Sequence, residues 1–473
     1  MQGDVTASAS RFITGAHLDD VPEDVRRAGR HSILDGIGLA LAGSRSSAVE
    51  IARAEISAYG IPMGPASVLG GSLRLPARFA AFLNALAIHA DDYDDTQLAT
   101  KPDRVYGLLT HPTAPVLPPT LALGETVGAA GSDVLLAYLV GVEVETKVAE
   151  AIDPRHYEAG FHTTGTVGTL GAASASARML GLDAQTTSVA LGIAASEASG
   201  LRENFGTMTK PLHAARAAEN GVLAAQLAAR GFTAARNILE ARRGFFSAAG
   251  GGYDAGVAVS LGEPWTFASP GVSIKPHPSG SLTHPAMTVL ANLISQYGLR
   301  GDDIAEVRVG ANRHMPNALI HHDPRDPLAA KFSMEFCMAV LCVEGRAGLP
   351  EFTDVVVNRS DIRDMMGRVR FEVDEEADAA GFNTMTSIVT VTLRDGRVVS
   401  GRAAFAKGSP QNPMSEAELL DKFLECAEVA GVDRGAASHA AELVLRLEAQ
   451  PGLETIVGLL SPSLAPAASG APG

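Results

Sequence analysis

The feature of this chain that most constrains its fold is a long stretch of helical periodicity that stops near Pro270. From about residue 5 to residue 268, apolar residues recur at helical spacing, and only short loops separate the periodic segments. Aromatic residues make up 5% of the chain, which also contains 49 glycines. Because small residues let helices approach closely, this composition favours packed helices over a β-sandwich. We therefore predict a large helical domain over residues 1–268.

The period of the hydrophobic pattern changes after Pro270. A predicted helix over 285–297 is followed by residues 304–309, which alternate between apolar and polar side chains as a half-buried strand does. Two further alternating runs flank Asp395-Gly396, the pair of residues typical of a tight hairpin. The pattern predicts three further segments: a smaller α+β unit over 269–405, helices again over 406–460, and a disordered tail over 461–473.

Charge and cysteine content argue against several classes of partner. The formal net charge is -15, whereas nucleic acids and anionic membranes require a basic protein surface. The three cysteines lack the spacing of a zinc or iron–sulfur site. No run reaches the roughly 20 apolar residues of a membrane span, and the first residues lack the basic and apolar regions of a secretion signal. We expect a cytoplasmic protein that binds neither nucleic acid nor membrane.

Lysine is scarce in this chain, with seven lysines against 31 arginines. Two of the seven lie in segments rich in small, polar and cationic residues, Thr207–His213 and Lys275–Gly280, and His162–Thr166 has a similar composition. Each segment is predicted to lie near a helix start, where unpaired backbone N–H groups and the positive dipole end attract carboxylates. A lysine such as Lys210 is unfavourable beside a helix start, so local stability does not explain it. The three segments predict a pocket for a small polyanion.

An acidic motif, His89–Thr96, extends the alanine-rich helix predicted over 79–88. Its four aspartates within five residues repel one another unless caps or cations compensate them. If the helix continued through the motif, His89, Asp92 and Thr96 would lie within about 60° of one another. Three interpretations are open: a capped acidic helix end, a functional site, and the Asp-Asp-x-x-Asp signature of magnesium-dependent isoprenoid synthases. The last lacks a second acidic motif and the aromatic residues that would shield a carbocation.

Three other residues have an ordinary explanation beside a functional one. His111 precedes Pro112 after a long loop, and a histidine there is usually a plain loop residue. His213 is predicted one turn into a helix, as either a partner of the site or a core histidine. Lys331 and Glu335 have i,i+4 spacing, which predicts a simple ion pair.

Taken together, these motifs resemble the MmgE/PrpD family, which includes 2-methylcitrate dehydratase, cis-aconitate decarboxylase and iminodisuccinate epimerase. The resemblance extends to about residue 455 and rests on these segments: His89–Thr96, His111-Pro112, Gly160-Phe161-His162, Asn204–Pro211, Lys275-Pro276 and Lys331–Phe336. It implies a mainly helical domain built from both chain ends, an inserted α+β lid and a homodimer. It also implies catalysis without a metal or another cofactor.

The resemblance further implies a set of site residues. Residues that match the pocket of the decarboxylase branch, and so the expected catalytic group, are Asp92, Thr96, His111, His162, Lys210 and Lys275. Neighbouring residues of the same motifs, expected to bind substrate, are His89, Thr163, Thr209, His213, His277, Ser279 and Phe336. Phe336 replaces a tyrosine of the decarboxylases, and the loop between Thr96 and His111 is longer than theirs. Both departures point away from cis-aconitate itself as the substrate.

The family's reactions share one intermediate, a carbanion beside a carboxylate. We expect Lys210 and Lys275 to hold substrate carboxylates and stabilise that charge. His111 and His162 are candidate proton carriers, and Asp92 is expected to orient a histidine or act as base, with Thr96 adding a hydrogen bond.

The expected function is that of a metal-independent lyase on a small di- or tricarboxylate. Dehydration ranks ahead of decarboxylation, and epimerisation of a dicarboxylate such as iminodisuccinate is the alternative. A binding protein without catalytic activity is the least favoured of these functions.

Overall fold

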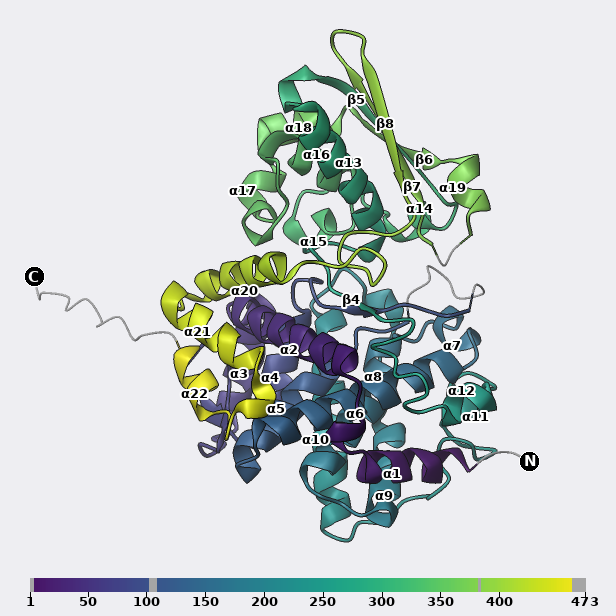
Figure 1. Ribbon diagram of the computed structural model, residues 1–473, viewed down its shortest axis with the longest axis vertical. Coiled ribbons are helices and arrows are strands. Elements are labelled where there is room, and N and C mark those ends of the chain that lie inside the picture. The colour runs from purple at the N-terminus through teal and green to yellow at the C-terminus, as the bar shows by residue number, and fades with distance from the viewer. Residues whose placement is uncertain (1–3, 102–108, 382–383, 462–473) are drawn as a thin grey trace, which may run out of the picture.

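The computed structural model describes residues 4–101, 109–381 and 384–461. Figure 1 shows two parts, and each part has a hydrophobic core of its own. The larger core is formed by helices from the first half of the chain and by the C-terminal helices. The smaller core lies almost wholly within residues 282–393. The tail predicted to be disordered lies, from residue 462 onward, outside the described residues.

The larger part is helical because its segments carry apolar and small residues at helical spacing and bury them against one another. Its first helices are α1 (Val5–Gly15), α2 (Glu23–Gly43), α3 (Ser47–Ala58), α4 (Ala77–His89), α5 (Thr113–Val127) and α6 (Gly131–Ala151). They are followed by α7 (Arg155–Glu158), α8 (Thr163–Met179), α9 (Ala184–Glu197), α10 (Thr209–Ala229), α11 (Phe245–Ala249) and α12 (Ala255–Val259). The chain returns to this part with α20 (Glu416–Ala430), α21 (Arg434–Val444) and α22 (Glu454–Leu459). In Figure 1 the yellow C-terminal helices lie against the purple α2, so both chain ends build one core.

Two short antiparallel strand pairs join segments of the larger part. One pair is β1 (Ala66–Ser67) with β2 (Arg74–Leu75). The other pair is β3 (Thr96–Gln97) with β4 (Val272–Ser273), which aligns Thr96 with Ser273. The second pair matters for the site, because it brings residues distant in sequence to the end of α4.

The smaller part combines helices with one mixed sheet of four strands. The strands are β5 (Ile304–Ala311), β6 (Val369–Val373), β7 (Ser387–Leu393) and β8 (Val398–Ala403), in the order β6-β5-β7-β8. β5 and β6 are parallel, and the other neighbours are antiparallel. The helices are α13 (His284–Tyr297), α14 (Met315–Ala318), α15 (Pro327–Ala330), α16 (Met334–Glu344), α17 (Asp354–Val357), α18 (Ser360–Met366) and α19 (Glu375–Ala379).

The predicted mainly helical fold with a small mixed sheet in its C-terminal region is confirmed. The division of the chain at residues 268 and 405 stays a prediction. The predicted continuation of α4 through the acidic motif is wrong, because the helix ends at His89 and Asp92 takes a positive φ of 51°. The helix start predicted near the segment Thr207–His213 lies at Thr209, where α10 begins. None of the described helices is long and apolar enough to cross a membrane.

Close packing between α8 and α10 depends on a glycine. A Cβ atom added to Gly221 would lie 2.4 Å from the Cβ of Ala172 and 2.6 Å from its carbonyl carbon. Those contacts are shorter than van der Waals separations, and the Ala172 backbone lies inside a helix that cannot shift freely.

We predict that Gly221→Ala lowers the free energy of unfolding by about 1–3 kcal/mol through overpacking, despite the better helix propensity of alanine. Urea unfolding measures the change. Gly458→Ala in α22 is the control, because a Cβ there would meet no atom within 4 Å. A Gly221→Ala protein as stable as the wild type would contradict the close packing.

Candidate active site

One buried carboxylate, that of Asp92, contacts two ammonium groups. Lys210 Nζ makes a short ion pair with Asp92 Oδ1, and Lys275 Nζ lies 3.3 Å from Oδ2. Lys275 Nζ also donates a hydrogen bond of 2.7 Å to the backbone oxygen of Asp92. Burial alone would raise the pKa of Asp92, but the charges of Lys210 and Lys275 outweigh it and hold that pKa well below its ordinary value. Asp92 is therefore an anion throughout the physiological range.

Three separate elements bring these groups together. Asp92 follows the end of α4 in the left-handed region, which few residues other than glycine adopt but which aspartate tolerates. Lys210 occupies the second position of α10. Lys275 follows β4, and the pairing of β4 with β3 places it beside the segment that carries Asp92.

A third buried lysine, Lys422 of α20, fixes the backbone on which the site is built. Its Nζ donates to the backbone oxygens of Tyr93 at 3.1 Å and of Lys275 at 2.8 Å. The same ammonium lies 2.6 Å from Asp35 Oδ1 on α2 and 3.8 Å from the centre of the Tyr93 ring. The Lys422 ammonium therefore connects α20 to α2 and to both segments that meet at Asp92.

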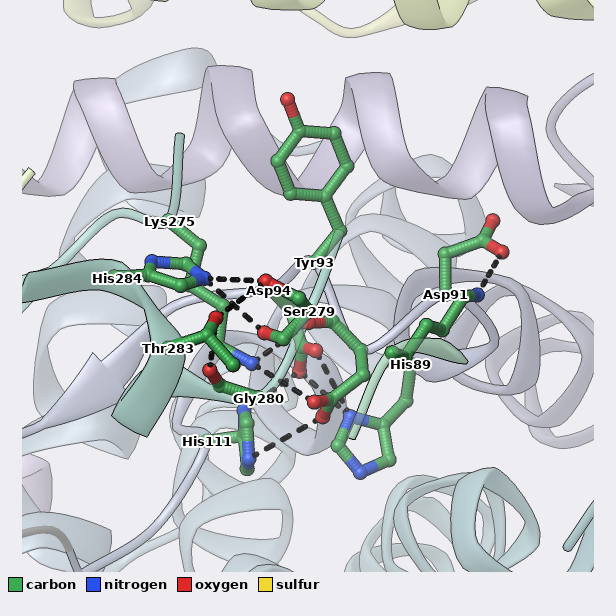
Figure 2. Close-up of polar contacts among 12 residues, drawn as sticks. His89, Asp91, Tyr93, Asp94, His111, Lys275, Ser279, Gly280, Thr283 and His284 are labelled. Carbon is green, nitrogen blue, oxygen red and sulfur yellow. Dashed lines mark hydrogen bonds and ion pairs between the residues drawn. The ribbon is translucent and has the colours of Figure 1, made fainter. Parts of the chain in front are cut away.

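Asp94 orients two histidines, whose rings approach it from different sides in Figure 2. His89 Nδ1 lies 2.8 Å from Asp94 Oδ2, and His111 Nδ1 lies 3.4 Å from the same oxygen. The His111 contact is within ion-pair distance but lacks hydrogen-bond geometry. Burial lowers the pKa of His89 to about 4, so this ring is neutral and the Nδ1 proton bridges to Asp94. His111 Nε2 lies 4.0 Å from Asp92 Oδ1, which places the His111 ring between two carboxylates.

His162 belongs to a second pair of imidazoles. Its Nδ1 lies 3.0 Å from Nδ1 of His213, so one of the two rings donates and the other accepts. Burial and nearby positive charges hold the pKa of His162 well below its ordinary value, so the ring is neutral. The contact with His213 leaves Nε2 of His162 as the nitrogen that can meet a ligand.

The four aspartates of the acidic motif each have their own surroundings. Their partners are Lys331 for Asp91, Lys210 and Lys275 for Asp92, His89 and His111 for Asp94, and Thr113 for Asp95. Burial raises the pKa of Asp95 to about 7, and its carboxyl group pairs with the Thr113 hydroxyl at 2.5 Å. The cations and caps required by four clustered acids are therefore present.

The ion pair predicted between Lys331 and Glu335 is wrong. Lys331 Nζ lies 2.7 Å from Asp91 Oδ1, whereas Glu335 pairs with His322 at 2.8 Å. The helical spacing fails because Lys331 follows the end of α15 and Glu335 belongs to α16.

A cavity of about 430 Å³ opens onto these groups. Its lining includes all six residues of the expected catalytic group: Asp92, Thr96, His111, His162, Lys210 and Lys275. The cavity also has lining residues that the sequence analysis did not single out, among them Tyr157, Arg202, Phe205, His321 and Phe332. Phe205 and Phe332 lie inside the motifs that carry the family resemblance. Arg202, Tyr157 and His321 had no comparable signal.

The seven residues expected to bind substrate do not line this cavity. Thr163 is buried at the start of α8, and Thr209 at the start of α10 faces a separate surface groove. His277 Nδ1 contacts the backbone oxygen of Ala347 at 3.0 Å, and Phe336 packs against Phe352 in the smaller core.

The remaining three lie behind the cavity wall and contact other polar groups. His89 contacts Asp94, and His213 contacts His162. Ser279 Oγ lies 2.9 Å from the Thr283 hydroxyl, in the group beside Lys275 in Figure 2 that also contains His284. These residues support the cavity wall and do not form its surface.

The side chains of His89, Asp92, Asp94 and His111 bring four potential metal ligands within 4.8 Å of one another. The charges around them fit a metal poorly. Two ammonium groups already neutralise Asp92, and a divalent cation would have to displace or repel both. The Asp-Asp-x-x-Asp interpretation fails for a related reason, since Asp91 and Asp95 have different partners and do not share a metal-binding face with Asp92.

The mainly helical fold carries a cavity whose wall includes ammonium and imidazole groups. A model of the MmgE/PrpD N-terminal domain matches residues 7–258, and one of the MmgE/PrpD C-terminal domain matches residues 277–448. The chain therefore belongs to the MmgE/PrpD family, which confirms the resemblance seen in its motifs.

Several relatives of this chain carry the name cis-aconitate decarboxylase. Cis-aconitate decarboxylase of Homo sapiens is 29% identical over 432 residues, which cover 89% of this chain and 87% of the relative. Cis-aconitate decarboxylase of Aspergillus terreus is 27% identical over 485 residues, covering 97% and 96% of the two chains. The corresponding protein of Mus musculus is 28% identical over 443 residues.

We predict that Lys422→Met lowers the free energy of unfolding by about 3–5 kcal/mol, because Asp35 becomes a buried charge without a partner. Urea unfolding and turnover are measured for this variant and for Asp35→Asn/Lys422→Met. The double variant regains much of the stability, since no buried charge remains. Its kcat stays low because the backbone oxygens of Tyr93 and Lys275 still lack their donor. Full recovery of kcat together with stability would contradict the positioning role of Lys422.

We predict that Asp95→Asn gains stability relative to the wild type as pH rises from about 4 to about 7. The Asp95 carboxyl group has a folded-state pKa of about 7 against an ordinary 3.8, so the stability it contributes is full below pH 3.8 and lost as pH rises through 7. An asparagine mimics the neutral acid and loses no proton. Urea unfolding between pH 5 and 8 measures the difference.

Asp378→Asn is the control for this pH dependence. Its carboxyl group has a pKa lowered to about 2 by Arg313, so the stability it contributes is lost only as pH falls from 3.8 through 2. The free energy of unfolding of Asp378→Asn therefore differs from that of the wild type by a constant amount between pH 5 and 8. Parallel curves for Asp95→Asn and the wild type would show that Asp95 is not held neutral.

Proposed function

We propose that the protein is a metal-independent lyase that removes CO2 from a small di- or tricarboxylate of the cis-aconitate type. The observation that carries this proposal is the pair of buried lysines that share the single carboxylate of Asp92 at the cavity wall. Two ammonium groups against one carboxylate leave one positive charge for a ligand. The names of the decarboxylase relatives support loss of CO2 as the reaction, whereas the sequence alone had favoured loss of water.

Lys210 and Lys275 bind the carboxylate beside the reacting carbon. When the C–C bond to the departing carboxylate breaks, its electron pair stays on the substrate carbon and spreads into the carboxylate that remains. That carboxylate gains negative charge as CO2 leaves, so ammonium groups already in place stabilise the transition state more than the ground state. Burial strengthens the effect because water does not screen these charges.

His111 supplies the proton that ends the reaction. Its Nδ1 lies 3.4 Å from Asp94 Oδ2, which orients the ring, and the ring lines the cavity, where it can pass a proton to the substrate. The proton bonds to the substrate carbon, and His111 regains one from solvent through the open cavity. His162, which is neutral, is suited to donate or accept a hydrogen bond through Nε2, and the Thr96 hydroxyl adds a further bond.

Two departures from the decarboxylases pointed away from cis-aconitate, and the first of them, Phe336, is only weak evidence against this substrate. Phe336 is fully buried and does not line the cavity, so a missing hydroxyl at this position does not remove a group from the cavity surface. The second departure, the longer loop, includes residues 102–108, which lie outside the described residues.

Incubation with di- and tricarboxylates in D2O, read by NMR, tests the proposal. Release of CO2 with one deuterium in the product supports the decarboxylase. Formation of an alkene with loss of water would identify a dehydratase, and deuterium exchange without net reaction would identify an epimerase. Binding of these acids without exchange would reduce the protein to a carboxylate-binding function.

We predict that Lys210→Ala and His111→Ala each lower kcat at least ~100-fold, the effect of removing one group that stabilises a developing charge. Lys407→Ala is the matched control, because Lys407 pairs with Glu418 outside the cavity. Steady-state turnover of each purified variant gives the comparison. Activity near that of the wild type in both site variants would overturn the assigned roles.

The homodimer and the cytoplasmic location implied above stay predictions. Light scattering of the purified chain tests the dimer.

A further inference from the structure

Arg202 is a cavity cation that the site described so far does not use. Among the described residues, three permanently charged cations line the cavity, and two of them, Lys210 and Lys275, contact Asp92. Arg202 has no carboxylate within ion-pair distance in the described part of the chain, and the buried Nε of its half-buried side chain has no hydrogen-bond partner there. In a protein with net charge -15, a cavity arginine without an acidic partner calls for a ligand.

The position of Arg202 is fixed through its backbone. Its N–H donates to the backbone oxygen of Gly160 at 2.8 Å, and His162 N–H donates to the oxygen of Gly200 at 3.0 Å. Leu201 and Phe161 form an antiparallel bridge between these two bonds. This short pairing ties Arg202 to the segment that carries His162, so both side chains reach the same cavity.

The plane of the guanidinium group is also held. Its central carbon lies 3.8 Å from the centre of the Tyr157 ring, and Tyr157 lines the cavity as well. Stacking on an aromatic ring occupies one face of the guanidinium and leaves the in-plane N–H donors available. A fork of in-plane donors matches the two oxygens of a carboxylate better than it matches a neutral group.

We propose that Arg202 binds a second carboxylate of the substrate, remote from the carboxylate held by Lys210 and Lys275, and so selects polycarboxylates with an additional acidic arm. This inference rests on the proposed function, because it concerns the same cavity and the same class of substrate. It assigns Arg202 to recognition and leaves the chemical step to the lysines and His111.

Binding of inert ligands tests this assignment without any turnover. Isothermal titration calorimetry compares propane-1,2,3-tricarboxylate with butyrate, which has a single carboxylate, on the wild type and on Arg202→Met. A charge-assisted hydrogen bond contributes about 1.5–3 kcal/mol, so we expect tricarboxylate affinity to fall at least ~10-fold in Arg202→Met. We expect butyrate affinity to change little, because its single carboxylate is held by Lys210 and Lys275 and leaves no carboxylate for Arg202.

Two further variants keep the test sharp. Arg202→Lys keeps the positive charge but lacks the planar set of guanidinium donors, so it should recover part of the preference for the tricarboxylate. Arg202→Gln replaces Arg202→Met in the comparison if Arg202→Met does not fold. Arg236→Met is the matched control, because Arg236 is exposed and does not line the cavity. Equal loss of both ligands in Arg202→Met, or unchanged binding of both, would overturn the inference, as would a wild type that does not distinguish the two ligands.

The outcomes also separate this inference from the proposed function. A wild type that binds the tricarboxylate through Arg202 but releases no CO2 from any substrate would refute the lyase and keep the subsite. If the wild type decarboxylates a tricarboxylate, and Arg202→Met has the same KM and the same ligand preference as the wild type, the lyase is supported and the Arg202 subsite is refuted.

Discussion

The arrangement of this protein around its cavity depends on one interaction, the sharing of the Asp92 carboxylate between Lys210 and Lys275. A single buried ion pair is electrically neutral and has nothing to offer an anion. Two ammonium groups around one carboxylate carry a net positive charge, while Asp92 limits the cost of burying them. The same carboxylate fixes the spacing of the two ammonium groups before any ligand arrives, which is the condition for electrostatic stabilisation of a developing charge.

Lysines, which are scarce in this chain, contact the segment that carries Asp92 from several sides. Four of the seven lysines in the chain are buried beside residues 91–93: Lys331 on Asp91, Lys210 and Lys275 on Asp92, and Lys422 on the backbone of Tyr93. They come from both parts of the molecule and from positions between residues 210 and 422. The left-handed backbone at Asp92 is therefore kept in place by contacts from elements that fold far from it in sequence, which is how a locally unfavourable conformation persists in a native state.

Sequence reasoning reached the fold and the central residues because those carry local signals. Helical periodicity marked the larger part, period-two alternation marked β5, β7 and β8, and rare lysines and histidines in small polar segments marked the cavity wall. The failures have a common physical cause. The helical wheel drawn through Asp92 assumed a continuing helix, and the spacing of Lys331 and Glu335 assumed that both lie on one helix. In each case a tertiary ion pair, to Lys210 and Lys275 or to Asp91, decided the conformation or the partner. Arg202 could not be found, because its only signal is the absence of an acidic partner, which no single sequence displays.

An acidic protein with a cationic cavity presents an apparent conflict, because a net charge of -15 repels polycarboxylates at long range. Screening resolves it. At physiological ionic strength the Debye length is about 8 Å, so exposed acids distant from the cavity contribute little to the potential inside it. The buried ammonium groups of Lys210 and Lys275 act at contact distance and through a medium that screens weakly. Local burial therefore decides what the cavity binds. The acidic surface instead favours solubility and discourages nucleic acids, without competing with the substrate.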